Sequence, residues 1–146
     1  MKKYREAKGY RKIPIGYSAT DTGALRPMLQ NYAVCRPDER ERMDFYAVNT
    51  YSWCGPDTTY NTSGYPQLQQ LAQDYPVPIW MSEVGCNTVP PRNFRDQHAV
   101  FSDPMAKTWS GAMIYEWIQE TNHYGLVSYG PAVDPTVQEG KRVVQG

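Results

Sequence analysis

The residues Pro78-Ile79-Trp80-Met81-Ser82-Glu83-Val84-Gly85-Cys86-Asn87 give the strongest indication of the fold of this chain. A short apolar run bounded by turn residues is typical of a buried strand, and this run stops at a carboxylate. Burying an unpaired charge is costly, and in parallel barrels the C-terminal strand tips carry catalytic groups. Glu83 is therefore the leading candidate for a chemical role. The alternative that stays open is a structural Glu83 that caps a loop or pairs with Arg92.

Apolar runs like this one recur along the chain, and helical patterns separate them. Strands are expected at residues 12–18, 43–51, 77–81 and 112–117. Helices are expected within residues 2–9, 21–32, 67–75 and 94–109. Alternation of this kind predicts an α/β fold with a parallel sheet. Four such units are half of a (β/α)8 barrel, a fold that usually needs about 250 residues.

The composition excludes several classes of protein. Among 146 residues, 15 Lys and Arg balance 15 Asp and Glu, so neither nucleic acid nor an acidic polymer is indicated as a partner. Mean hydropathy is −0.67 and no apolar run approaches the length of a membrane span. The charged start at Met1 to Glu6 is unlike a signal peptide. The sequence predicts no cofactor, and its two His are not at metal-ligand spacing.

Polar and aromatic residues gather where the expected strands end, which is the edge at which a parallel barrel places its active site. The candidates there are Tyr17, Asp21, Arg26, Asn49, Tyr51, Trp53, Glu83, Tyr115, Glu116 and Trp117. The chain has 12 Tyr and 4 Trp but only 3 Phe, and aromatic rings with a polar group suit sugar binding. The alternative is that these are packed rim residues.

A carboxylate among Tyr hydroxyls fits glycoside chemistry. A retaining glycosidase needs two carboxyl groups about 5–5.5 Å apart, and its nucleophile must stay ionised. A hydroxyl donated by Tyr51 would favour the ionised form of Glu83. Glu116 is the obvious second carboxylate, but strand alternation predicts that Tyr115 and Glu116 point to opposite faces. The sequence thus offers one good carboxylate and no convincing partner.

The three cysteines are an odd number, so one of them has no internal partner. Cys54 follows the second expected strand and Cys86 follows the third. Adjacent parallel strands place these loops side by side, so a Cys54–Cys86 bridge is feasible. Cys35 would then be unpaired. Three reduced, buried cysteines are the alternative.

Several motifs, in order and at matching spacing, resemble the fungal β-1,3-glucanosyltransferases of glycoside hydrolase family 72. They are Gly9–Arg11, Ile13–Asp21, Tyr51–Gly55, Thr62–Tyr65, Ser82–Asn87, Pro91–Phe94, Trp109–Gly111 and Tyr124–Val127. The resemblance implies that the chain is the C-terminal half of the catalytic (β/α)8 barrel, with strands five to eight. Residues 1–130 would form this partial domain, and residues 131–146 an unassigned tail.

The resemblance also implies roles for individual residues. Glu83 would be the nucleophile and Tyr51 the tyrosine that orients it, while Asp21, Arg26 and Tyr115 would bind glucan. Trp53 and Tyr17, at the strand tips, are further candidates for binding substrate. The family pairing supports a Cys54–Cys86 disulfide and places the partner of Cys35 downstream of the barrel.

The implied activity is retaining transfer that elongates β-1,3-glucan, with donor and acceptor glucan chains as partners and no cofactor. The implied location is the cell surface or wall, with a lipid (GPI) anchor. The 146 residues contain no Asn-Glu acid/base pair. We therefore expect the chain alone to be inactive and to need an N-terminal half-barrel. The alternatives are a non-catalytic glucan-binding or structural module, and a half-barrel that assembles with a separate half or with itself.

Overall fold

The computed structural model describes residues 1–128 as one four-stranded parallel sheet with helices packed against it. The strands, in the spatial order β1-β2-β3-β4, are β1 (Tyr17–Thr20), β2 (Tyr46–Asn49), β3 (Ile79–Val84) and β4 (Trp109–Ile114). The α-helices are α1 (Lys2–Ala7), α2 (Arg26–Val34), α3 (Tyr65–Ala72) and α4 (Arg95–Val100). Short 3-10 helices are η1 (Glu39–Glu41), η2 (Tyr60–Thr62) and η3 (Met105–Lys107). The expected half-barrel is confirmed, while the boundary expected near residue 130 lies outside the described residues.

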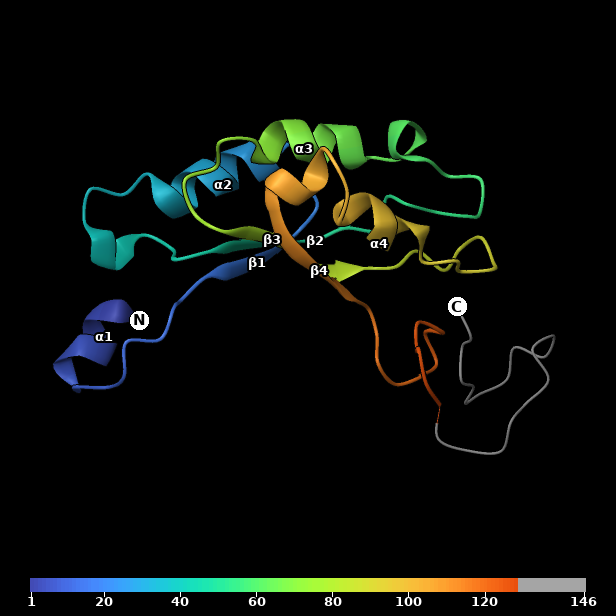
Figure 1. Cartoon of the computed structure of the whole chain (residues 1–146). Helices are drawn as coiled ribbons and strands as arrows, with labels where there is room; N and C mark the ends of the chain where they lie inside the picture. The colour runs from blue at the N-terminus through green and yellow to red at the C-terminus, as the bar shows by residue number, and fades with distance from the viewer. Residues whose placement is uncertain (129–146) are drawn as a thin grey trace.

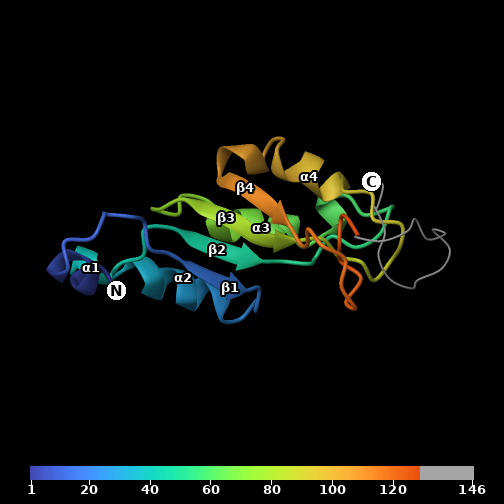
Figure 2. The ribbon, with the colours of Figure 1, turned by 90° about the horizontal axis from the view of Figure 1, so that it is seen from below.

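One face of the sheet is covered and the other is open within residues 1–128. Helices α2, α3 and α4 lie along the same side of the strands (Figure 1). Seen from below, on the side of the sheet away from these helices, the strands lie in front of α3 and alongside α2 (Figure 2). The core fills the space between sheet and helices, and it includes Tyr46, Val48, Leu68, Ile79, Met81, Val84, Val100 and Met105. On the opposite face, Ser18 and Ser82 donate to Asn49 Oδ1 at 3.1 and 2.6 Å, as strand alternation requires.

The first strand differs from the expected one, because β1 begins at Tyr17 instead of ending at Ser18. Pro14 has no N–H for a ladder, and the backbone of Ile15 bonds with Asp44, whose carboxylate accepts at 2.8 Å. Residues 12–16 therefore run as irregular chain. As a result, Tyr17 lies at the start of the strand, away from the edge that carries Glu83.

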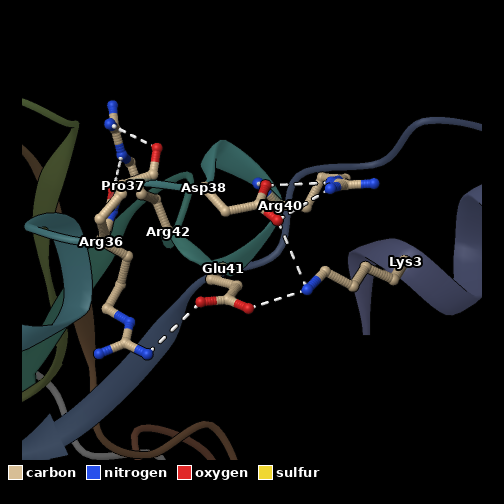
Figure 3. A network of polar contacts seen from close by, with 7 residues as sticks. All are labelled: Lys3, Arg36, Pro37, Asp38, Arg40, Glu41 and Arg42. Atoms are coloured by element: carbon tan, nitrogen blue, oxygen red, sulfur yellow. Dashed lines mark hydrogen bonds and ion pairs between the residues drawn. The ribbon is translucent and has the colours of Figure 1, made fainter.

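The N-terminal end of the sheet is bordered by an exposed network of charges between α1 and the η1 segment (Figure 3). Lys3 Nζ lies 2.8 Å from Glu41 and 3.4 Å from Asp38, and Arg40 pairs with Asp38 at 2.9 Å. The Arg40 side chain and backbone bonds hold the pKa of Asp38 well below its usual range. These contacts hold α1 against η1.

Candidate active site

Glu83 lies one residue before the end of β3, at the C-terminal edge of the sheet. Its backbone carbonyl accepts from the Thr50 N–H at 2.8 Å, and its Oε2 accepts from the Tyr51 hydroxyl at 2.5 Å. The proposed pairing with Arg92 is not found, because the Arg92 guanidinium donates to two backbone carbonyls. The Glu83 carboxylate is therefore bonded to Tyr51, as the functional interpretation requires, and is not paired with Arg92.

The surroundings of Tyr51 keep its hydroxyl protonated, so that it can donate a hydrogen bond. Burial first, and then the hydrogen bond to Glu83, raise the pKa of the Tyr51 hydroxyl far above its usual range. A neutral hydroxyl donated to a carboxylate favours the ionised carboxylate. The contact can thus orient the Glu83 carboxylate.

A second and a third tyrosine enclose this contact. The Tyr51 ring lies edge-on to Tyr115 and Tyr124, with centroids 6.2 and 5.5 Å apart, and Tyr115 and Tyr124 are 5.4 Å apart. We call Tyr51, Tyr115 and Tyr124 the tyrosine triad. The structure places Tyr115, a candidate residue, against Tyr51, whereas Tyr124 was not among the candidate residues. Its motif, Tyr124–Val127, was the only sequence signal for it.

The expectation that Tyr115 and Glu116 point to opposite faces was wrong. Strand β4 ends at Ile114, so both residues belong to the following loop and strand alternation does not apply. The Asn122 amide donates to Glu116 Oε1 at 2.7 Å and to the Tyr115 hydroxyl at 3.3 Å. The two side chains therefore lie on the same side of the loop.

Asp21 and Arg26 form an ion pair beside the site, with Oδ1 and Nη1 2.9 Å apart. Arg26 is buried at the start of α2, and the hydroxyl of buried Thr50 donates to Asp21 Oδ2 at 3.2 Å. The Asp21 N–H also donates to Asn49 O at 3.1 Å. These contacts join the loop after β1 to the loop after β2, next to Tyr51.

Trp53 and Tyr17 are not part of the tyrosine triad. The half-buried Trp53 indole packs on Tyr65 of α3, with centroids 5.2 Å apart, and its buried Nε1 has no hydrogen-bond partner within residues 1–128. Tyr17 packs against Tyr46, whose ring belongs to the helix-covered core. Their roles in binding substrate stay predictions.

The expected disulfide is confirmed. Cys54 and Cys86 are bonded, with Cα atoms 5.1 Å apart. The bond joins the loop that carries Tyr51 to the loop that follows Glu83. Cys35 is exposed and forms no disulfide within the described residues.

No three His, Cys, Asp or Glu side chains of residues 1–128 are grouped so that they could hold a metal ion. None of the helices there has both the length and the apolar character needed to cross a bilayer.

The family model described as glucanosyltransferase matches residues 1–139 of the sequence. This chain belongs to that family, glycoside hydrolase family 72. The resemblance noted from the motifs is thereby confirmed.

Two relatives and one solved structure show how much of this chain the similarity covers. The 1,3-beta-glucanosyltransferase PGA5 of Candida albicans is 46% identical over 86% of this chain and 21% of its own length. For GAS5 of Saccharomyces cerevisiae, the identity is 45% over 87% of this chain and 26% of the relative. Saccharomyces cerevisiae Gas2p, solved with laminaritriose and laminaritetraose, superposes with a TM-score of 0.79 at 41% identity, covering 86% of this chain and 28% of Gas2p. The chain thus spans about a quarter of the length of the relatives it matches.

Proposed function

We propose that this chain supplies the nucleophile side of an active site that transfers segments of β-1,3-glucan. The observation that carries the proposal is the Tyr51–Glu83 hydrogen bond at the C-terminal edge of a parallel sheet. The family membership supports it, and so do the names of the glucanosyltransferase relatives and the oligosaccharides bound to Gas2p. Cell-surface or cell-wall location with a lipid anchor belongs to the same proposal.

The first chemical step would be attack by a Glu83 carboxylate oxygen on the anomeric carbon of the donor glucan. The glycosidic bond breaks, and the departing 3-oxygen takes a proton from an acid/base carboxyl group. In the second step the 3-hydroxyl of an acceptor glucan attacks the same carbon and gives its proton to that group. The Glu83 ester bond then breaks and the product is a longer β-1,3-glucan.

The acid/base group is not assigned to this sequence. The 146 residues contain no Asn-Glu pair, and we assign this role to the other half of the barrel. Loss of general acid catalysis costs about 10²–10⁴-fold. We therefore expect the chain alone to show no transfer between laminari-oligosaccharides, and product formation by the purified chain would contradict this.

The remaining site residues would hold sugar. The half-buried Tyr115 and Tyr124 offer ring faces and hydroxyls next to Tyr51, the hydrogen-bond partner of Glu83. The ion pair of Asp21 with buried Arg26 fixes the neighbouring loop, and the partly exposed Asp21 carboxylate lies at its rim. An acceptor sugar held against such aromatic groups would keep water from the glycosyl-enzyme, and this favours transfer over hydrolysis.

A laminaribiosyl fluoride with fluorine at C2 tests the nucleophile directly. Fluoride leaves without protonation, so the missing acid is not needed, and the C2 fluorine slows breakdown of the ester. Mass spectrometry should find one glycosyl group on the peptide that contains Glu83. Glu83→Gln should abolish the label, whereas Glu116→Gln, a carboxylate in the next loop, should keep it.

Labelling and calorimetry together distinguish this proposal from the main alternative, a non-catalytic glucan-binding module. A non-catalytic glucan-binding module would bind laminari-oligosaccharides in calorimetry, and Glu83→Gln would leave that affinity intact. It would give no covalent label. Binding without labelling by a folded chain would therefore favour the module.

A further inference from the structure

The loop that carries Tyr115 and Tyr124 is fastened from outside the triad by Arg92. Its Nη1 donates to the carbonyl of Tyr124 at 2.6 Å and its Nη2 to the carbonyl of Tyr115 at 3.0 Å. The guanidinium also lies 5.0 Å from the ring centre of Phe94. One planar group thus bridges the two ends of the loop that supplies two triad rings.

The slot for Arg92 is shaped by its neighbours. Gly85 has φ +130°, and a Cβ there would lie 2.2 Å from Arg92 Nη2 and 3.0 Å from the Tyr115 carbonyl. Burial lowers the pKa of the Arg92 guanidinium, while nearby buried Asp96 opposes that effect. A planar, partly buried guanidinium that donates two hydrogen bonds to uncharged carbonyls holds those two carbonyls at a fixed distance and orientation.

Asn87 fastens the same loop at a second point. Its amide donates to the carbonyls of Asn122 and His123 at 3.0 and 3.1 Å. Three successive carbonyls before Gly125 are therefore held by side chains from the loop after β3. That loop is in turn bonded through Cys86 to the loop that carries Tyr51.

We propose that Arg92 is a positioning residue that places Tyr115 and Tyr124 against Tyr51 and thereby sets the Tyr51–Glu83 hydrogen bond. Its importance for catalysis rests on the proposed function. The geometric part does not, because it concerns only the contact between Tyr51 and Glu83. Asn87 supports the same placement with a smaller effect.

The test uses the whole chain with tyrosines labelled with carbon-13 at Cζ. The Tyr51 NMR signal is assigned by its loss in Tyr51→Phe, and the shift caused by Glu83→Gln reports the hydrogen bond. In Arg92→Met, the Tyr51 signal should move toward its position in Glu83→Gln. Adding Glu83→Gln to Arg92→Met should then cause a smaller shift than Glu83→Gln causes in the parent, because the two residues are coupled through Tyr51.

The matched control is Arg95→Met, three residues further on. Arg95 is exposed and its guanidinium donates to the carbonyl of Pro56, outside the triad. Its loss should leave the Tyr51 signal unchanged. A folded Arg92→Met protein with the Tyr51 signal of the parent overturns the proposal.

If Arg92→Met does not fold, Arg92→Lys and Asn87→Ala decide. Lys keeps the charge but lacks the planar fork, so the Tyr51 signal should still shift. An unchanged signal in both variants overturns the proposal. A second readout is the rate of labelling by the fluoride, which should fall about 10²-fold in Arg92→Lys with probe affinity nearly constant. If the parent itself is not labelled, the proposed function fails, and the Tyr51 signal still decides this inference.

Discussion

Two ion-pair clusters at opposite ends of the sheet differ in their exposure to water. At the C-terminal end, Asp21 pairs with an Arg26 that is only 4% exposed, next to the Tyr51–Glu83 contact. At the N-terminal end, the pairs of Lys3 with Asp38 and Glu41 lie at the surface (Figure 3). Water screens exposed pairs and gives them little energy, whereas a buried charge depends on its partner. The buried Asp21–Arg26 pair should therefore contribute more to stability than the exposed pairs of Lys3.

The largest loss of stability should follow from removing one partner of the buried Asp21–Arg26 ion pair. Arg26→Met leaves Asp21 without its cation and should lower the free energy of unfolding by about 3 kcal/mol. Urea denaturation followed by circular dichroism measures this. Lys3→Met, at the other end, should leave the midpoint unchanged within error. Equal losses in both variants would contradict the contrast between the two ends.

The Cys54–Cys86 disulfide crosslinks two loops at the C-terminal end of the sheet, so its loss should also destabilise that end. Loss of a crosslink over a separation of 32 residues should cost about 2–4 kcal/mol. The Cys54→Ser/Cys86→Ser double variant should show this in denaturation, and should also weaken laminari-oligosaccharide binding because the Tyr51 and Glu83 loops separate. Cys35→Ser, at an exposed cysteine, is the control. A double variant as stable as the control would show that hydrogen bonds alone hold the loops.

Gly85 tests how tightly the Arg92 slot is packed. Gly85→Ala adds a methyl group that meets Arg92 Nη2, on a backbone with positive φ, and should cost about 1–3 kcal/mol. Gly111→Ala has a similar φ of +147° but no atom within 4 Å of the added Cβ. Gly111→Ala should therefore lower the stability less than Gly85→Ala does, and it should leave the Tyr51 NMR signal unchanged. If the two variants lose the same stability, strain in the backbone explains both.

Asp96 should give the smallest effect, and one that depends on pH. Burial raises the pKa of the Asp96 carboxyl, and hydrogen bonds from Gln97 oppose this only in part. The ionised form therefore lowers stability above the raised pKa, and the penalty disappears when both states are protonated, below about pH 4. Asp96→Asn should raise the denaturation midpoint at pH 7 but not at pH 3. The exposed Asp57→Asn should change neither, and a gain at pH 3 would contradict this explanation.

The fold was largely predictable because alternating strand and helix patterns leave few topologies. The strand boundaries were less so. Residues 12–16 are apolar enough for a strand, yet Pro14 and the Asp44 carboxylate divert their backbone. Tyr115 and Glu116 were assigned to a strand that ends before them. In each case a tertiary contact or a chain bend overrode the local pattern.

The sequence by itself determined the parallel half-barrel, the family, the position of Glu83 at a strand tip and the choice of Tyr51 as its neighbour. Strand periodicity and ordered motifs are local properties, so they can be read along the chain. Only the tertiary structure decided that Tyr124 joins Tyr51 and Tyr115, and that Arg92 bonds to carbonyls instead of Glu83. Those contacts join loops far apart in the chain, and their geometry depends on how the strands place the loops in space.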